Sequence, residues 1–474
     1  MLLVFVIYFS LLLIISHYTA KGGNDAFFRA GRQSPWPLVA FGMVGASISG
    51  LTFVGVPGWV ESIDMTYMQM CLGFVVGYVI VAFVLLPLYY KHGLTSIYTY
   101  LDKRFGRVSY KTGASFFILS KMLGSAAKFY VAVQILQACM ADSYVLPYPL
   151  TALITLLFIW LYTRRSGIRT IVWTDVVQTF CLLLALILIL SKVCSMLDMN
   201  FTEAVSAVWN DSHSRMFEWS DWTSRQYFWK QFLSGIFVVI VMTGLDQDMM
   251  QKNLTCKDLR SAQKDMCSYG LLFVPVNFLF LALGILLLML YSKLGMDVPL
   301  AGDELLSNMV FSGTLGKAVV IFFGIGVVAS AFSSADSSVT ALTTSYCIDI
   351  RGREGDETLR KRTHLVMMLV FYLCTLAFNA LGNGSVMDMI YTLVGYTYGP
   401  LLGLFAFGML TKRVPQERYV PFVAILSPVV CYVIDYFTMK YMSYKFGYEI
   451  LMFNGLLTFC GLYLLSSRGR CQEQ

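Results

Sequence analysis

Hydroxyl side chains and an acid lie inside an otherwise apolar stretch of the chain, VVASAFSSADSSVTALTTSYCIDI at 327–350. Five of its residues recur at positions i, i+3, i+4, i+7 and i+11, so they share one helical face. They are Ser330, Ser333, Ser334, Ser337 and Ala341. Asp336 lies at the edge of that face. Serines alone also serve as packing residues between membrane helices, but hydroxyl oxygens beside a carboxylate suit a monovalent cation.

A second acid, Asp175, occurs in GIRTIVWTDVVQTF at 167–180, about one and a half helical turns into another apolar stretch. An ionisable group inside a membrane costs at least about 2.5–3.5 kcal/mol and is a functional candidate for that reason. Alone, Asp175 is equally well explained as an interfacial acid that pairs with the arginines at 164, 165 and 169. Together with Asp336, it favours a shared cation site.

A third stretch, GASISGLTFVGVPG at 45–58, carries four glycines, one proline and three hydroxyl residues in an apolar segment. A broken helix survives in a bilayer only where protein or a polar cavity satisfies the freed backbone groups. Carbonyls released near Gly45 and Ile48 would be cation ligands. The alternative is that the glycines allow close helix packing beside a proline kink.

A second interrupted segment, VMTGLDQDMMQ at 241–251, has Gly244 followed by two acids. It lies five predicted spans after the first, and because five is odd the two segments run in opposite directions through the bilayer. That relation is expected of an inverted five-plus-five repeat. The predicted divisions are a peripheral N-terminal helix at 1–18, a first repeat at 36–193, an outer loop at 194–228, a second repeat at 229–411, and two peripheral helices with a short cytoplasmic tail at 412–474.

The composition places these segments in a membrane. Hydrophobic residues make up 57% of the chain and charged residues 13%, which leaves too little polar surface for a soluble protein of 474 residues. Stretches of about 18 or more mostly apolar residues mark thirteen candidate spans in the sequence. They are 1–18, 36–59, 67–90, 112–139, 145–163, 170–193, 229–251, 267–292, 315–349, 364–382, 387–411, 419–438 and 448–466. The predicted fold is therefore an all-α polytopic membrane protein.

Basic residues divide unequally between the two sets of alternate loops. One set holds 25 of the 35 Lys and Arg residues. The other holds Arg215, Arg225, Lys293, Lys440 and Lys445. This asymmetry predicts a multi-pass protein of the plasma or inner membrane, with its N-terminus outside and its C-terminus in the cytoplasm. The net charge of +7 then reflects topology and not a nucleic-acid partner, and no obligate protein partner is inferred.

The order of these motifs resembles the sodium:solute symporter family, which includes the sodium–glucose, sodium–proline and sodium–sialic acid cotransporters. The resemblance extends over roughly residues 1 to 466 and is carried by SPWPLVAFGMVGASISGLTFVGVPGWV, WTDVVQ, DQDMMQ, FSSADSSVTALTTSYCIDI and GYTYGPLLGLFAFGMLTKR. It implies a LeuT-like fold of about 13 transmembrane helices. It also implies alternating access driven by sodium.

The resemblance implies a primary sodium ion held by carbonyls at the first broken helix and by oxygens of the hydroxyl-lined helix. The matching positions are Gly45, Ile48, Ser330, Ser333 and Ser334. Some members, among them the bacterial sialic acid transporters, have a further sodium site, which matches Asp175, Asp336 and Ser337 here. This sequence has a carboxylate, Asp336, at a position where the sialic acid transporter has a hydroxyl residue. A second sodium ion and a proton-titrating pair of acids therefore stay open as alternatives.

The resemblance also implies solute contacts beyond the first break. The matching positions are Ser47, Ser49, Thr52, Tyr67 and Cys71, with an amide lost at the last. The arginine that binds the sialic acid carboxylate is replaced by Gly124, but Lys128 lies about one turn away on the same helical face. A carboxylate solute would be a partner for Lys128, and the alternatives are an ion pair with an aspartate or snorkelling toward an interface. For Lys121, nearer the cytoplasmic end, snorkelling is expected.

Asp246 and Asp248 lie near the predicted cytoplasmic mouth, beside Lys252, Lys257 and Arg260. We interpret these acids as a gating or structural ion-pair network and not as ligands. The preceding residues, GIFVVIVMTG at 235–244, offer few hydrogen-bonding side chains, which disfavours a neutral hexose.

The sequence therefore predicts a sodium-coupled secondary active symporter that imports a small organic solute, with a sugar acid such as sialic acid or another carboxylate as the first hypothesis. A sodium symporter of a neutral sugar or an amino acid is the alternative. A channel or sensor on the same fold is more remote, because no selectivity-filter repeat or soluble signalling domain occurs. An enzyme is not expected, since neither HExxH nor GxSxG occurs, although Asp175 and Asp336 are formally an acid pair.

Overall fold

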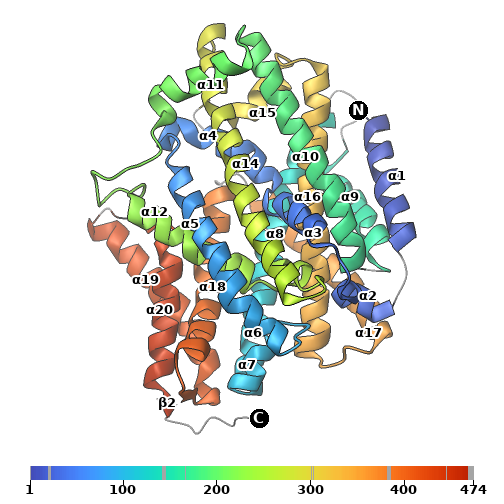
Figure 1. Ribbon diagram of the computed structural model, residues 1–474, viewed down its shortest axis with the longest axis vertical. Helices are drawn as coiled ribbons and strands as arrows, with labels where there is room; N and C mark the ends of the chain where they lie inside the picture. Colours follow the sequence, from blue (N-terminus) through green and yellow to red (C-terminus); the bar gives the residue numbers. More distant parts are fainter. Residues whose placement is uncertain are drawn as a thin grey trace.

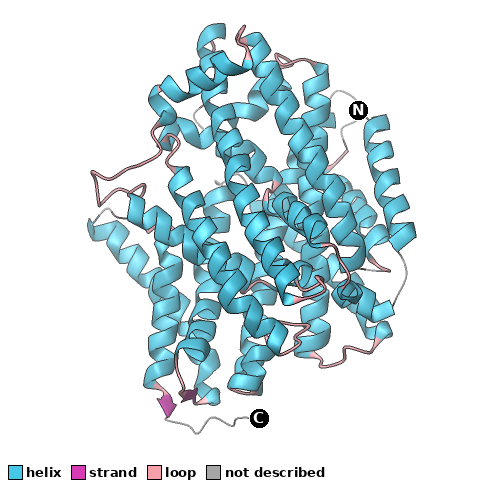
Figure 2. Cartoon of the chain, in the orientation of Figure 1, coloured by secondary structure: helices cyan, strands magenta, loops and turns pink. Residues whose placement is uncertain are grey.

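A computed structural model describes residues 2–19, 23–140, 146–165, 167–299, 302, 304–381, 386–442, 444 and 446–467. Within these ranges the chain is almost entirely helical, as Figures 1 and 2 show. The predicted all-α class is confirmed. Among the described residues, the strands are β1 (Val414–Pro415) and β2 (Ser466–Ser467), which pair antiparallel with Val414 opposite Ser467.

The helices follow one another with short connections. In the first part of the chain they are α1 (Leu2–Thr19), α2 (Gly23–Arg29), α3 (Trp36–Ser47), α4 (Gly50–Ile63), α5 (Tyr67–Ile80), α6 (Leu86–Lys91), α7 (Thr99–Arg104), α8 (Arg107–Met140), α9 (Tyr148–Thr163) and α10 (Ile168–Met196). In the second part they are α11 (Phe201–Asn210), α12 (Phe228–Val239), α13 (Gln247–Asn253), α14 (Leu259–Leu294), α15 (Glu304–Phe311), α16 (Lys317–Ser345), α17 (Glu357–Leu381), α18 (Val386–Leu410), α19 (Val420–Met442) and α20 (Glu449–Leu464).

Eight helical stretches in the described ranges are long and apolar enough to cross a membrane, and the number rises to ten if each of two bent pairs is one span. The bent pairs are α3 with α4 and α12 with α13. Shorter apolar helices, α1, α9 and α20, lie where the sequence predicts the spans 1–18, 145–163 and 448–466. Every predicted span thus contains a helix or a bent pair, while a full crossing by the three short helices stays a prediction.

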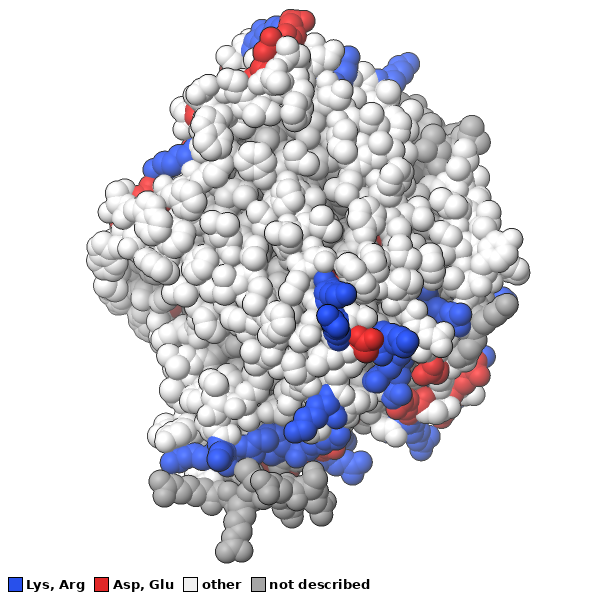
Figure 3. Space-filling model, in the orientation of Figure 1, with Lys and Arg blue, Asp and Glu red and all other residues white. Residues whose placement is uncertain are grey.

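Apolar side chains are exposed along the outer helices. On α17, Leu365, Leu369 and Leu373 recur at every fourth position, and each is more than half exposed. Such a row is unfavourable in water and suits a lipid environment. Figure 3 shows Lys and Arg gathered toward the lower end of the visible face, below a broad uncharged region. The chain is a multi-pass membrane protein.

The interior is organised around α10 and α16, which pack along each other. Helix α3 packs on α10, and α8 packs on α16, so the first broken helix reaches the same core as the hydroxyl-lined helix. Glycines permit a close crossing of α5 and α12. A Cβ on Gly73 would lie 2.2 Å from the Phe232 carbonyl oxygen, and one on Gly235 would lie 2.3 Å from the Met70 carbonyl oxygen.

The predicted outer loop at 194–228 contains more regular structure than expected. Helix α10 continues to Met196, and α11 follows it with a reciprocal cap between Asn200 and Glu203. Figure 1 places α11 and α15 at the end of the molecule opposite α7 and β2. Both helices are too short to give the hydropathy pattern of a membrane span, so hydropathy alone does not predict them.

Candidate ion and solute site

The first broken helix is interrupted at Ile48 and Ser49, whose ψ angles of 97° and 165° are extended. The Ser49 N–H donates to Thr52 Oγ1 at 3.3 Å, and the Thr52 N–H donates to Ser49 Oγ at 3.3 Å. In a continuous helix these two N–H groups would bond the carbonyls of Gly45 and Ile48. Because of the reciprocal cap, the carbonyls of Gly45 and Ile48 lack the N–H donors that a continuous helix would provide. These are the two carbonyls that the resemblance implies as sodium ligands.

The second break, between α12 and α13, is satisfied by the protein itself. The two parts bend by 71° after a π-helical turn at Ile240–Gly244. Tyr89 donates to the Gly244 carbonyl at 2.8 Å and Tyr98 donates to the Leu245 carbonyl at 2.7 Å. Because tyrosines engage these carbonyls, the first break offers the better cation ligands.

The first break lies between α10 and α16. A Cβ on Gly45 would lie 2.0 Å from Thr179 Oγ1, so only glycine permits this approach of α3 to α10. On the other side, a Cβ on Gly50 would lie 3.1 Å from Val327 Cγ1 and 3.4 Å from Ser330 Oγ. The start of α4 thus lies against the beginning of the hydroxyl face of α16.

Three serines of α16 differ in how their hydroxyls are used. Ser330 Oγ donates to the Val327 carbonyl at 2.9 Å, and Ser333 Oγ donates to Asp175 Oδ1 at 2.6 Å. Ser334 Oγ is buried and has no hydrogen-bond partner in the described part of the chain. Such a hydroxyl, on a helix that packs against α3 and α4, together with carbonyls that lack their helical donors, suits a hard cation that binds oxygen. The residues implied for the primary site fit a sodium ion.

The residues implied for a second sodium site fit poorly. Asp175 Oδ2 lies 2.8 Å from Lys252 Nζ, at ion-pair distance but without the angles of an aligned hydrogen bond. Asp336 Oδ2 accepts from the Tyr162 hydroxyl at 2.7 Å, and Ser337 Oγ donates to the carbonyl of its own helix at position 333. Each of the three predicted ligands has a protein partner, and one of those partners is a cation. A sodium ion at Asp175 would lie close to the Lys252 ammonium and would be repelled by it.

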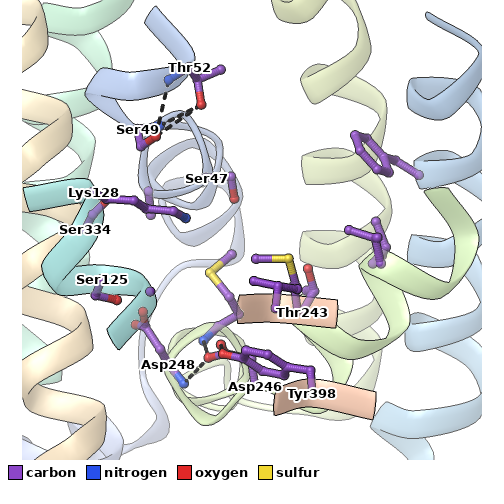
Figure 4. A pocket seen from close by; sticks show the side chains of 18 of the residues that line it. Ser47, Ser49, Thr52, Ser125, Lys128, Thr243, Asp246, Asp248, Ser334 and Tyr398 are labelled. Atoms are coloured by element: carbon purple, nitrogen blue, oxygen red, sulfur yellow. Dashed lines mark hydrogen bonds between the residues drawn. The ribbon is translucent and has the colours of Figure 1, made fainter. Parts of the chain in front are cut away.

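A cavity of about 160 Å³ lies beside the first break. Five of the six predicted solute contacts line it, whereas Cys71 is fully buried and is not part of its wall. The five are Ser47, Ser49, Thr52, Tyr67 and Lys128. In Figure 4, Ser49 and Thr52 lie at one end of the cavity and Asp246 and Tyr398 at the other, with Lys128 between them. Apolar and aromatic side chains complete the wall; among them are Met70, Phe74, Tyr78, Val238, Val239, Met242, Tyr269, Phe273 and Val394.

Two lysines of α8 line this cavity in different ways. Lys121 Nζ lies 3.1 Å from Asp246 Oδ2 and 2.7 Å from Asp248 Oδ2, so the expectation that it snorkels is wrong. Among the side chains that the structure describes, which leave out those at 141–145 and 386–392, no carboxylate lies within ion-pair distance of Lys128, which also lines the cavity. Within that set the Lys128 ammonium reaches the cavity without a counter-charge.

The acids of the second break form an ion-pair network, but not with the expected partners. Lys121 supplies the cation within ion-pair distance, whereas Lys252, the first of the three expected neighbours, pairs with Asp175. The Tyr398 hydroxyl donates to Asp246 Oδ2 at 2.7 Å. Asp246 also caps α13 by accepting from backbone N–H groups. The network links α8, α13 and α18 at the end of the cavity away from Ser49 and Thr52.

Several residues of the site escape detection in the sequence. Lys252 counts as a loop residue there, yet its side chain in α13 is 1% exposed. Tyr269 of α14 contacts the Ser47 hydroxyl and accepts a hydrogen bond from the Tyr78 hydroxyl at 2.7 Å. For Lys252, the sequence signal is its spacing of four residues from Asp248, which places the two on the same face of a helix. The tyrosines have no such signal, because single tyrosines are common in apolar helices.

The model of the sodium:solute symporter family matches residues 27–417. The chain is 27% identical over 409 residues to the human sodium/iodide cotransporter, a match that covers 82% of this chain and 62% of the relative's length. It is 24% identical to the sodium/sialic acid symporter of Proteus mirabilis, with 86% of this chain and 84% of the relative covered. It is also 24% identical to the human sodium-coupled monocarboxylate transporter 1, covering 83% of this chain and 66% of the relative.

The fold is similar to that of solved transporters. A substrate-bound, outward-open sodium-coupled sialic acid symporter superimposes with a TM-score of 0.81 at 18% identity, over 98% of both chains. Mhp1, a nucleobase-cation-symport-1 family transporter, gives a TM-score of 0.56 at 14% identity, over 94% of this chain and 96% of the other. These likenesses confirm the expected LeuT-like fold.

Proposed function

The chain belongs to the sodium:solute symporter family, and from this membership we propose that it imports a small organic anion, a carboxylate, together with sodium. The observation that carries the proposal is the Lys128 ammonium, which lines the cavity with no counter-charge among the side chains that the structure describes. A cation held near the middle of a membrane is costly unless a partner of opposite charge is present. A solute carboxylate supplies that partner only while it is bound.

The names of three relatives agree with an anionic solute. They are transporters of iodide, of sialic acid and of monocarboxylates, all of which are anions at neutral pH. Identity to each of them is below 30%, so the similarity supports the class of solute and not one compound. The family comprises transporters and not enzymes.

The size of the cavity favours a compact carboxylate. Its volume of about 160 Å³ resembles that of engineered protein cavities of roughly 150 Å³ that bind benzene. Hydroxyls of Ser47, Ser49 and Thr52 can give hydrogen bonds at one end, charged groups of the Lys121 network lie at the other, and apolar and aromatic side chains line much of the wall between them. This mixture is typical of small-molecule sites, in which a few polar groups orient the solute. We favour a short-chain or ring monocarboxylate over a bulky sugar acid.

Sodium would couple to the solute through the first break. Carbonyls of Gly45 and Ile48, the carbonyl of Ser330 and the hydroxyls of Ser333 and Ser334 would hold the ion. Such an ion joins α3 to α16, while the residues just beyond the break line the solute cavity. Binding of the ion would therefore stabilise the wall that receives the solute.

Transport would follow alternating access. In this proposal the repeats at 36–193 and 229–411 move against each other around the cavity, which lies between the two breaks. The N-terminus lies outside the cell and the C-terminus inside, in keeping with the asymmetry of basic residues. Lys121, with Asp246, Asp248 and Tyr398, would then close the cytoplasmic side.

Flux into proteoliposomes tests the proposal. Purified protein is reconstituted and given an inward sodium gradient, with radiolabelled lactate, benzoate, sialic acid, glucose and proline offered separately. We expect a compact carboxylate to accumulate against its own gradient only when sodium is higher outside. Accumulation of glucose or of zwitterionic proline, but of none of the three anions lactate, benzoate and sialic acid, would reject an anionic solute. A downhill ion current without solute accumulation would reject symport altogether.

A further inference from the structure

A buried ammonium occupies the place where the resemblance puts a second sodium ion. Lys252 Nζ lies 2.8 Å from Asp175 Oδ2, and both side chains are 1% exposed. The ammonium of lysine is a compact point charge of the same sign as sodium. At Asp175, the cation that a second site would recruit from solution is already supplied by the chain.

The position of Lys252 is fixed by its own helix. The neighbouring Gln251 donates to the Phe28 carbonyl at 2.9 Å and to Thr344 Oγ1 at 3.0 Å. The other neighbour, Asn253, donates to the Ala262 carbonyl at 3.0 Å. These buried amides attach α13 to α2, α14 and α16, so Lys252 is held inside the protein and does not reach toward an interface.

Both oxygens of the Asp175 carboxylate contact protein groups. One oxygen accepts the Ser333 hydroxyl at 2.6 Å, and the other faces Lys252. A sodium ion at the same carboxylate would lie close to the ammonium and would be repelled by it. Asp336 Oδ1 has no hydrogen-bond partner among the described residues, but a single oxygen does not make a sodium site.

We propose that the Lys252 ammonium takes the place of a second sodium ion at Asp175, so that this chain binds one sodium ion, at the break between α3 and α4. The inference rests on the proposed function only for the existence of that first ion. It also assigns Asp175 a positioning role. Because Ser333 donates its hydrogen to Asp175, the lone pairs of its oxygen are left for sodium. Lys252 neutralises Asp175 and holds it in this arrangement.

Equilibrium binding of ²²Na⁺ to the purified full-length protein tests this inference without transport. We expect the wild type to bind one ion per chain at saturation, with a Hill coefficient of one. In Lys252→Met the carboxylate loses its fixed cation, and we expect a second ion to bind and the Hill coefficient to rise toward two. Lys252→Arg, which keeps the charge, and the double variant Asp175→Asn with Lys252→Met should each bind one ion.

The outcomes are distinguishable from one another. Two ions bound by the wild type would overturn the inference, and so would one ion bound by a monodisperse Lys252→Met protein. No sodium bound by the wild type would instead reject the sodium site of the proposed function. If Lys252→Met does not yield folded protein, the wild-type stoichiometry still decides whether a second ion binds.

Discussion

Ser333 Oγ donates a hydrogen bond of 2.6 Å to Asp175 Oδ1, which joins the hydroxyl face of α16 to the acid of α10. This bond orients a serine implied as a sodium ligand and connects it to the buried pair of Asp175 and Lys252. Ser334, the next residue, keeps its hydroxyl free of protein partners in the described chain. The two adjacent serines therefore differ in role, one held by an acid and the other available to an ion.

Replacing both serines by alanine removes two oxygen ligands from the proposed sodium site. We expect the double variant Ser333→Ala with Ser334→Ala to lose sodium-driven uptake and to raise the sodium concentration for half-maximal binding at least about tenfold, equivalent to about 1.4 kcal/mol. The measurement is a ²²Na⁺ titration of purified protein. Thr375→Val is the control, because Thr375 is a buried hydroxyl on α17 that bonds only its own helix. Unchanged sodium affinity would remove these serines from the site.

Lys128 should matter for the solute and not for stability. Replacing it by methionine keeps most of the length of the side chain and removes the charge. Since a hydrogen bond to a charged group contributes about 1.5–3 kcal/mol, we expect KM for a carboxylate solute to rise about 10- to 150-fold. Uptake assays at saturating sodium give KM, and thermal unfolding checks the fold. A wild-type KM in the methionine variant would contradict the proposed role of Lys128.

Replacing Lys121, seven residues earlier on the same helix, should instead lower the stability of the fold. Its replacement by methionine leaves Asp246 and Asp248 buried without a cation, and removal of one partner of a buried ion pair costs about 3–5 kcal/mol. We expect a clear fall in the midpoint of thermal unfolding. Adding Asp246→Asn and Asp248→Asn should recover much of this loss. A triple variant no more stable than the single one would indicate that Lys121 acts through packing alone.

A substitution of Thr52 tests the role of the reciprocal cap between Ser49 and Thr52 at the first break. In Thr52→Val the shape is kept, but the Ser49 N–H loses its acceptor and can return to the Gly45 carbonyl. We expect weaker sodium binding and a loss of stability of about 0.5–2 kcal/mol, as for other helix caps. Sodium titrations at several solute concentrations separate this effect from a lost solute contact. A change in solute KM with sodium affinity unaltered would assign Thr52 to the solute alone.

Gly45 should tolerate no side chain. A Cβ at this position would lie 2.0 Å from Thr179 Oγ1 and 2.9 Å from Thr179 Cα, so α3 or α10 would have to shift. Overpacking of this kind costs about 1–3 kcal/mol, and here it would also displace a proposed sodium ligand. We expect Gly45→Ala to fold less stably and to bind sodium weakly. Gly124→Ala is the matched control, since nothing lies within 4 Å of a Cβ there. Equal behaviour of the two variants would argue against the tight contact.

Features that depend on local pattern could be predicted from the sequence. Hydropathy located the helices, and glycines beside hydroxyls or acids located both breaks, because these effects act along one segment. The partner of Asp175 could not be found in this way. Lys252 counts as a loop residue by its place after DQDMMQ, and its burial beside α10 arises from the bend of 71° that turns α13 into the protein. The pairing of Lys121 likewise depends on the approach of three helices.

The reciprocal cap of Ser49 and Thr52 also has a mechanical consequence. The hydrogen bond from the Ile48 N–H to the Val44 carbonyl lies within the end of α3, and both bonds of the cap lie within the start of α4. None of these three bonds spans the torsion ψ of Ile48, whereas the bond from the Ser49 N–H to Thr52 Oγ1 spans φ of Ser49. Rotation about ψ of Ile48 would therefore break none of the three bonds. We expect this turn to act as a hinge about which α4 can tilt while its first amide groups stay protected.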